Sequence, residues 1–180
     1  MRQASFGNST ITLLQGDITT VHADAIVNAA NASLAGGGGV DCAIHRAGGP
    51  QILAECRSIG QCPTGSAVMT CAGNLAARFV IHAVAPRWRG HPHDPDLLSS
   101  AYLSGLKLAD EAQARSVAFP SLGTGAYAYP LREAATIALS TVSRYLMRSG
   151  TSIKLVTFVL FSATDLAVYE SELVTIAARE

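Results

Sequence analysis

The sequence predicts an α/β fold, because segments with the pattern of buried strands alternate along the chain with segments of helical periodicity. Two of the connections that lead from a strand to a helix are rich in glycine and other small residues, at 36–39 and 121–127. In α/β sheets such loops lie at the carboxyl ends of strands, where ligands bind. With 180 residues, 49% of them hydrophobic, the chain can bury one core of ordinary size. We therefore expect a single domain over residues 1–180.

The expected elements follow in order along the chain, after an irregular start at residues 1–8. Apolar runs bounded by turn residues predict strands at 11–14, 25–27, 66–70, 79–84, 117–120 and 155–161. Apolar residues at three- and four-residue steps predict helices at about 40–47, 51–58, 95–112, 131–145 and 166–177. We expect Asp94 to cap the third helix, Gly150 to end the fourth, and Ser162 with Asp165 to cap the fifth.

Composition and cysteine spacing exclude several classes of protein. Basic and acidic residues number 13 each, so the net charge indicates neither a nucleic-acid partner nor a membrane surface. No apolar run reaches the length of a membrane span. The chain has four cysteines: Cys42, Cys56, Cys62 and Cys71. They form no C-x-x-C pair, and their spacing from the histidines is not that of zinc ligands. We therefore expect reduced thiols, a cytoplasmic location, a monomer and no metal or cofactor.

The first small-residue loop, Gly36 to Gly39, predicts a phosphate site. Four glycines leave the backbone open to a ligand, so successive N–H groups can point into one concavity. A helix that begins at about Val40 adds its free N–H groups and the positive end of its dipole. The alternative is a flexible glycine linker followed by a surface helix.

Polar side chains on both sides of this loop can complete a binding site. Asp41 and His45 are four residues apart at the start of the predicted helix, so they share one face. Asn28 and Asn31 precede the glycines, and their carboxamides can hold ribose hydroxyls because they both donate and accept hydrogen bonds.

The second loop resembles the first in its position between a strand and a helix. The backbone from Gly123 through Ala126 can wrap a diphosphate, and Gly125 lies at its centre. Ser121 and Thr124 add hydroxyl groups, and Tyr127 can cover the ligand. A tight turn is the alternative for an isolated Gly-Thr-Gly.

Three further residues have both a functional and an ordinary interpretation. Asp17 follows the first strand and can accept a hydrogen bond from an exocyclic amine, or cap the next turn through Thr19. Phe161 can stack on a base, although core packing is the default for an aromatic at a strand end. For His82, we expect a buried imidazole hydrogen-bonded to the backbone.

The chain resembles the macrodomain family, in particular its ADP-ribose-hydrolysing branch, which includes O-acetyl-ADP-ribose deacetylases. The resemblance spans nearly the whole chain, and its motifs agree in order and spacing: residues 16–19, 26–31, 36–41, 43–45, 121–125 and Tyr127. It implies a three-layer α/β/α sandwich around a mixed, mostly parallel sheet. It also implies ADP-ribose, O-acetyl-ADP-ribose or mono-ADP-ribosylated proteins as ligands.

The resemblance assigns roles to individual residues. Asp17 resembles the acceptor for the adenine amine, with Ile18 as its backbone neighbour, and Phe161 resembles the stacking residue. The first diphosphate loop corresponds to Gly38, Gly39 and Val40, and the second to Ser121 and Gly123 through Tyr127. Asn31 resembles the residue that holds the distal ribose, and Asp41 the catalytic acid or base. His45 and Asn28 resemble the residues that support Asp41. Gly123 and Ala128 depart from the family, which often has serine and glycine at these positions.

The chemistry that this implies is hydrolysis at the distal ribose or at an ester carbonyl. Asp41 can orient or deprotonate a water molecule, with Asn31 and His45 completing the catalytic set. An ordinary aspartate is a weak base at neutral pH, so either burial strengthens it or the ligand's phosphate helps to activate water. One rival is an ADP-ribose reader without catalysis. A nicotinamide oxidoreductase is disfavoured, because the glycines do not form G-x-G-x-x-G.

Overall fold

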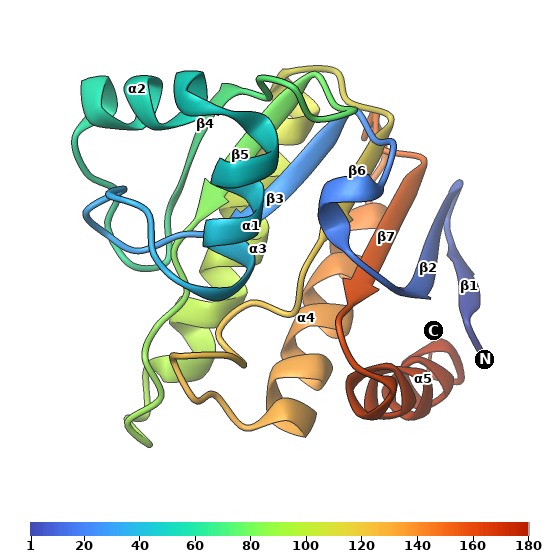
Figure 1. Ribbon diagram of the computed structural model, residues 1–180. Coiled ribbons are helices and arrows are strands. Elements are labelled where there is room, and N and C mark those ends of the chain that lie inside the picture. Colours follow the sequence, from blue (N-terminus) through green and yellow to red (C-terminus); the bar gives the residue numbers. More distant parts are fainter. Residues whose placement is uncertain (180) are drawn as a thin grey trace.

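A computed structural model describes residues 1–179 and is built around one seven-stranded sheet (Figure 1). The strand order is β1-β2-β7-β6-β3-β5-β4; the five inner strands run parallel, and β1 and β4 are antiparallel edge strands. The sheet is therefore mixed and mostly parallel, as expected. Its strands are β1 (Gln3–Phe6), β2 (Ser9–Gln15), β3 (Ala25–Ala29), β4 (Ala67–Cys71), β5 (Phe79–Ala83), β6 (Ser116–Phe119) and β7 (Leu155–Leu160).

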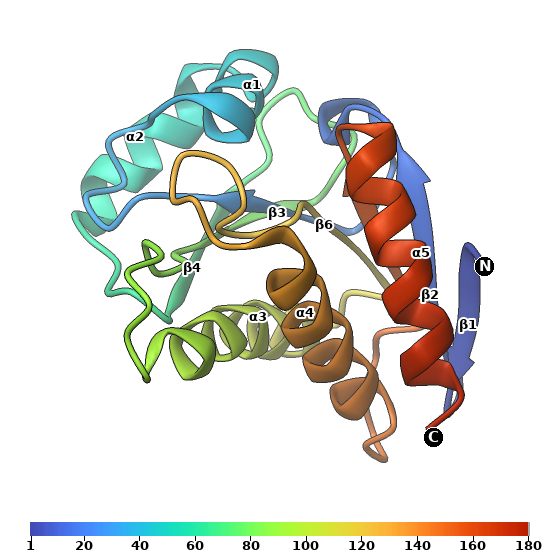
Figure 2. The ribbon, with the colours of Figure 1, turned by 90° about the horizontal axis from the view of Figure 1, so that it is seen from below.

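Helices cover both faces of this sheet, which confirms the three-layer α/β/α architecture (Figure 2). One face packs against α1 (Gly39–Gly48), α2 (Pro50–Ile59) and the short 3₁₀ helix η1 (Ile18–Thr20). The other packs against α3 (Asp94–Glu111), α4 (Leu131–Leu146) and α5 (Ala163–Ala177). Strand residues alternate between the two cores: Ile26 of β3 belongs to the first, whereas Ala25 and Val27 belong to the second. No described helix is long and apolar enough to cross a membrane.

The parallel strands place the polar loops at one edge of the sheet. The carboxyl ends of β2, β7, β6 and β3 are neighbours in that order. They lead respectively into Asp17, Phe161, the loop 121–130 and the glycine loop 30–38. Four segments that are far apart in the sequence therefore converge at one edge, in the position where α/β sheets bind ligands.

Three local expectations are corrected by the structure. Residues 3–6 are not irregular, because β1 pairs antiparallel with β2 through a turn at Gly7. The helix α4 ends at Leu146, and Gly150 lies in the turn that follows it. Asp94 is the first residue of α3 and not its cap; its carboxylate accepts hydrogen bonds from the backbone N–H groups of Arg89 and His91. Ser162 does cap α5, because its hydroxyl accepts from the Asp165 N–H.

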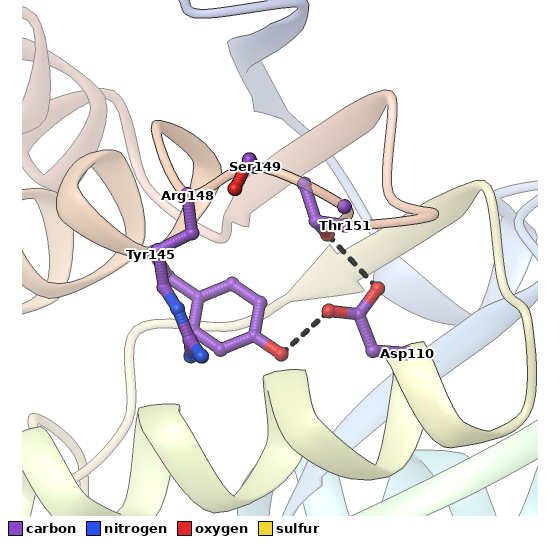
Figure 3. A pocket seen from close by; sticks show the side chains of 6 residues that line it. Asp110, Tyr145, Arg148, Ser149 and Thr151 are labelled. Carbon is purple, nitrogen blue, oxygen red and sulfur yellow. Dashed lines mark hydrogen bonds between the residues drawn. The ribbon is translucent and has the colours of Figure 1, made fainter.

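A small pocket of about 120 Å³ lies at the opposite edge of the sheet, beside the turn between α4 and β7 (Figure 3). Asp110 occupies its wall, with hydrogen bonds from Tyr145, Thr151 and Ser152 to its carboxylate. Burial alone would raise the pKa of Asp110, but these hydrogen bonds outweigh that effect and hold the pKa below its usual value. All of the carboxylate's contacts join α3 to α4 and to the chain before β7, so its role is structural.

We expect Asp110→Asn to lower the free energy of unfolding at pH 7 by about 1.5–3 kcal/mol, because several hydrogen bonds to a charged group are weakened. A pKa that is lower in the folded state contributes stability above the unfolded value, and this contribution is lost as the pH falls through the folded value. The difference between parent and variant should therefore shrink below about pH 4. Urea unfolding at several pH values measures it. Asp96→Asn, at an exposed position of the same helix, is the control and should change stability much less.

Candidate functional site

The candidate site is formed by loops that leave the sheet toward opposite faces. The chain after β3 runs to α1 on one face, whereas the chain after the neighbouring β6 runs to α4 on the other. This divergence is the topological switch point at which open α/β sheets bind ligands. The two small-residue loops that the sequence singled out both lie at this point.

The first of these loops is the glycine loop, at residues 36–39. The backbone N–H groups of Gly36, Gly37 and Gly38 donate to no other described residue, and α1 begins directly after them. The buried Leu34 side chain anchors the loop to the core. Asn31 braces it from within, because its Nδ2 donates to the Gly36 carbonyl at 2.9 Å. The loop is therefore an ordered cradle of free donors at the positive end of a helix, which is unlike a flexible linker.

The second of these loops spans residues 121–130. Among the described residues, no partner accepts a hydrogen bond from the backbone N–H groups of residues 123–127, so this loop also presents a run of free donors. Residues outside this run fix the loop in place. The Tyr169 hydroxyl donates to the Ser121 hydroxyl, and the Tyr129 N–H donates to the Gly123 carbonyl. Gly123 has φ = +81°, a conformation that favours glycine.

Asp41 lies in the first turn of α1 and is 4% exposed. Its Oδ1 accepts a hydrogen bond from Asn28 Nδ2 at 2.7 Å and lies 3.2 Å from His45 Nε2. Its Oδ2 has no hydrogen-bond partner among the described residues and faces Gly37, where an added Cβ would lie 3.2 Å from it. One carboxylate oxygen is thus held by the protein, and the other points toward the glycine loop.

A buried polar network lies behind Asp41. Asn28 is fully buried and its amide contacts Asp41, which agrees with a supporting role. The expectation that its carboxamide holds ribose hydroxyls is wrong, because the side chain is not accessible to a ligand. His82 is also fully buried, but its partners are side chains and not the backbone: Asn28 at 3.1 Å, Thr70 at 2.9 Å and, more distantly, the Cys56 thiol at 3.6 Å. Burial, together with the nearby His45, lowers the pKa of His82 to about 4.

His45, Cys56 and His82 come together in the same region, although their spacing in the sequence gave no sign of it. One potential ligand atom of each lies within 4.8 Å of the others. Both ring nitrogens of His82, however, already have hydrogen-bond partners. Burial, and then the charges of Asp41 and Glu55, raise the pKa of the Cys56 thiol to about 11. The hydrogen bonds of His82 are typical of a buried polar core.

Asp17 and Phe161 lie just beyond the ends of the neighbouring strands β2 and β7, whose last paired residues are Gln15 and Leu160. The Asp17 Oδ1 accepts hydrogen bonds from the Thr19 hydroxyl and then its N–H, and these lower the pKa of Asp17. The capping interpretation is therefore confirmed, while Oδ2 has no partner within residues 1–179. Phe161 is 86% exposed, so the core interpretation is wrong.

The structure adds a contact that the sequence did not reveal. The guanidinium of Arg87, in the loop after β5, lies 4.5 Å from the centre of the Tyr127 ring. The next residue, Trp88, donates its backbone N–H to the Tyr127 carbonyl at 2.8 Å. The only sequence signal was an arginine and a tryptophan in a loop that follows a strand. This pairing holds Tyr127 at the rim of the second loop.

Known proteins resemble this chain over most of its length. A family described as Macro domain matches residues 27–138. A macro domain-containing protein of Caldanaerobacter subterraneus is 58% identical over 88% of this chain and 93% of that protein. An O-acetyl-ADP-ribose deacetylase of Enterobacter cloacae is 51% identical, over 89% of this chain and 91% of that protein. The ADP-ribose glycohydrolase MACROD2 of Xenopus laevis is 48% identical over 91% of this chain, which spans 40% of that protein.

Solved structures give the same result. The Oceanobacillus iheyensis macrodomain with ADP superposes with a TM-score of 0.94 at 38% identity, covering 99% of this chain and 97% of that one. The Trypanosoma brucei macrodomain in complex with ADP-ribose has a TM-score of 0.84 at 41% identity, covering 89% and 68%. With its α/β/α layers, its two donor loops and its relatives of high identity, this chain belongs to the macro domain family.

Proposed function

We propose that this protein is an ADP-ribose-binding hydrolase that removes mono-ADP-ribose from acidic side chains of proteins, deacetylates O-acetyl-ADP-ribose, or does both. The observation that carries the proposal is Asp41, a buried carboxylate with one oxygen held by Asn28 and the other facing the glycine loop. An arrangement that only binds ADP-ribose has no need to bury a carboxylate at the ribose end, because burying a charge costs free energy. The names of the relatives, a deacetylase and a glycohydrolase, agree with this function.

The order of the loops along the sheet edge suggests how the ligand lies. Asp17 and Phe161, at the ends of β2 and β7, would bind adenine by a hydrogen bond and by stacking. The free N–H groups of the two loops would hold the diphosphate, at β6 and at the start of α1. The distal ribose would then lie near Asn31 and Asp41, after β3. The sequence of sites across adjacent strands therefore matches adenine, diphosphate and ribose in turn.

In the proposed reaction, Asp41 orients a water molecule beside the distal ribose and accepts its proton. The water oxygen forms a bond to the anomeric carbon or to the ester carbonyl carbon, the ester C–O bond at that carbon breaks, and the proton taken up by Asp41 passes to the leaving oxygen. The products are ADP-ribose and the free carboxylic acid, which is a protein side chain or acetate. His45 lies 3.2 Å from the opposite oxygen of Asp41 and supports the carboxylate in this role. A ligand phosphate that shares in activating the water is compatible with the same geometry.

Incubation of the purified protein with peptides ADP-ribosylated on aspartate or glutamate, and separately with O-acetyl-ADP-ribose, tests this function. We expect release of free ADP-ribose from at least one of them. Calorimetry should show tighter binding of ADP-ribose than of AMP, because AMP has neither the second phosphate nor the distal ribose. Binding of ADP-ribose with no turnover of either substrate would instead establish a reader.

Asp17→Asn tests the adenine contact apart from the helix cap. The asparagine keeps an oxygen for Thr19, but its amide group would meet the exocyclic amine of adenine with a second donor. We expect the affinity for ADP-ribose to fall by about 1.5–3 kcal/mol, the range for a hydrogen bond to a charged group, with little change in melting temperature. Calorimetry measures the loss. Inosine diphosphate ribose, which carries a carbonyl in place of that amine, should not suffer the same loss; unchanged ADP-ribose affinity would leave Asp17 only its capping role.

A further inference from the structure

His82 is a buried titratable group that the proposed reaction does not use. It lies on β5 directly opposite Asn28 of β3 in the strand register. Both side chains point to the face of the sheet that α1 and α2 cover, and both are fully buried. His82 therefore contacts the same Asn28 amide that holds Asp41.

The hydrogen bonds assign the tautomer of this imidazole. The Thr70 hydroxyl donates to the Cys71 carbonyl at 2.9 Å, so its oxygen is left to accept a hydrogen bond from His82 Nε2, also at 2.9 Å. Nδ1 then carries the lone pair and accepts from Asn28 Nδ2 at 3.1 Å. The lowered pKa of His82, about 4, keeps the ring neutral near pH 7, so Nδ1 remains an acceptor.

This acceptor determines how the Asn28 carboxamide is turned. Its Nδ2 donates two hydrogen bonds, one to Asp41 Oδ1 at 2.7 Å and the other to His82 Nδ1 at 3.1 Å. In the flipped orientation, Asn28 Oδ1 would face both a carboxylate oxygen and a lone pair. The observed orientation holds even though Asn28 Oδ1 has no protein partner among the described residues. The two donations outweigh that loss.

We infer that His82 is a positioning residue for the reaction: through Asn28 it fixes Asp41 Oδ1, so that Asp41 Oδ2 stays directed at the glycine loop. The inference rests on the proposed function, in which Asp41 acts on the substrate. Without the acceptor at Nδ1, the Asn28 amide can rotate, and the carboxylate loses its shortest protein hydrogen bond. We expect the rotation to change the position of the reacting water more than the affinity for ADP-ribose. That affinity depends on the backbone N–H groups of the two loops.

Two substitutions separate the two hydrogen bonds of His82. In His82→Asn, the side-chain oxygen can stand where Nδ1 is and accept from Asn28, whereas the bond to Thr70 is lost. In His82→Gln, the amide reaches the place of Nε2 and keeps the bond to Thr70, whereas the acceptor for Asn28 is lost. We expect His82→Gln to lower kcat at least tenfold with KM changed less than threefold, and His82→Asn to recover most of the lost kcat.

Thr141→Val serves as the control for general destabilisation, because it removes a partly buried hydrogen bond to Ser99 on the other face of the sheet. It should lower the melting temperature and leave kcat unchanged. In the parent protein, ¹⁵N NMR should show His82 with a proton on Nε2 only, and the Asn28 side-chain amide signals should shift in His82→Gln.

Equal kcat in His82→Gln and His82→Asn, or a parent His82 protonated on Nδ1, would overturn the inference. Its failure is distinguishable from failure of the proposed function. If Asp41→Ala lowers kcat and His82→Gln does not, the proposed function stands and the positioning role is wrong. If Asp41→Ala itself leaves kcat unchanged, the proposed role of Asp41 is what fails.

Discussion

Asp41→Ala is expected to lower turnover at saturating substrate by at least about tenfold, a conservative bound for the loss of a positioned general base. The substitution removes Oδ2, the carboxylate oxygen that faces Gly37, together with the oxygen held by Asn28. The fold should survive, because α1 keeps its packing through Ile44 in the core. Affinity should fall less than turnover, since the diphosphate is held by backbone N–H groups.

Turnover and affinity must be measured separately in this variant. Only a loss of kcat at saturation reports an interaction made in the transition state, and a change in KM alone reports binding. Calorimetry with ADP-ribose gives the affinity, and circular dichroism checks the fold. If saturated turnover stays near the parent value while affinity falls, Asp41 only positions the ribose, and the water must be activated by another group, such as the ligand's phosphate.

Gly37→Val is expected to have an effect of similar size on turnover, for a steric reason. A Cβ at Gly37 would lie 3.2 Å from Asp41 Oδ2 and 3.4 Å from Asn31 Nδ2. A branched side chain would therefore push apart the two side chains assigned to the distal ribose, and a displacement of about 1 Å can cost about a hundredfold in rate. We expect kcat to fall at least tenfold in the valine variant and less in Gly37→Ala, because one methyl group needs only a small shift.

Gly16→Ala is the matched control, because an added Cβ there meets open space and the backbone is not left-handed. Gly37 is exposed and likewise lacks a left-handed backbone, so its substitutions should leave the melting temperature nearly unchanged. Steady-state kinetics with the better substrate measures the series. Parent-like turnover in Gly37→Val would mean that the glycine loop yields freely, and that its distance to Asp41 does not govern the reaction.

Much of the fold and of the site could be predicted from the sequence, because these features depend on local patterns. Apolar runs and helical periodicity predicted the six inner and edge strands from β2 onward and all five α-helices, with small errors at their ends. The two donor loops were predicted as well, since runs of small residues between a strand and a helix constrain the backbone directly. Asp41 and His45 were placed on one face by their four-residue spacing, and they do meet.

Tertiary contacts decided the rest. Residues 3–6 have no pattern of their own and become a strand only because β2 offers an open edge. Phe161 is typical of a core aromatic, but β7 ends one residue earlier and leaves the ring at the exposed sheet edge. Local periodicity carries no information about which edge or neighbour a segment will meet.

The contact between His82 and Asn28 illustrates the same limit at the site. The two residues are 54 positions apart, and they meet because β5 lies beside β3 in a register that pairs them. The sequence by itself determined the family, the two loops and the residues around Asp41, since each of these lies within a short motif. The partners of the buried network, and thus which oxygen of Asp41 faces the loop, were decided only by strand order and side-chain packing, which join segments that no local pattern connects.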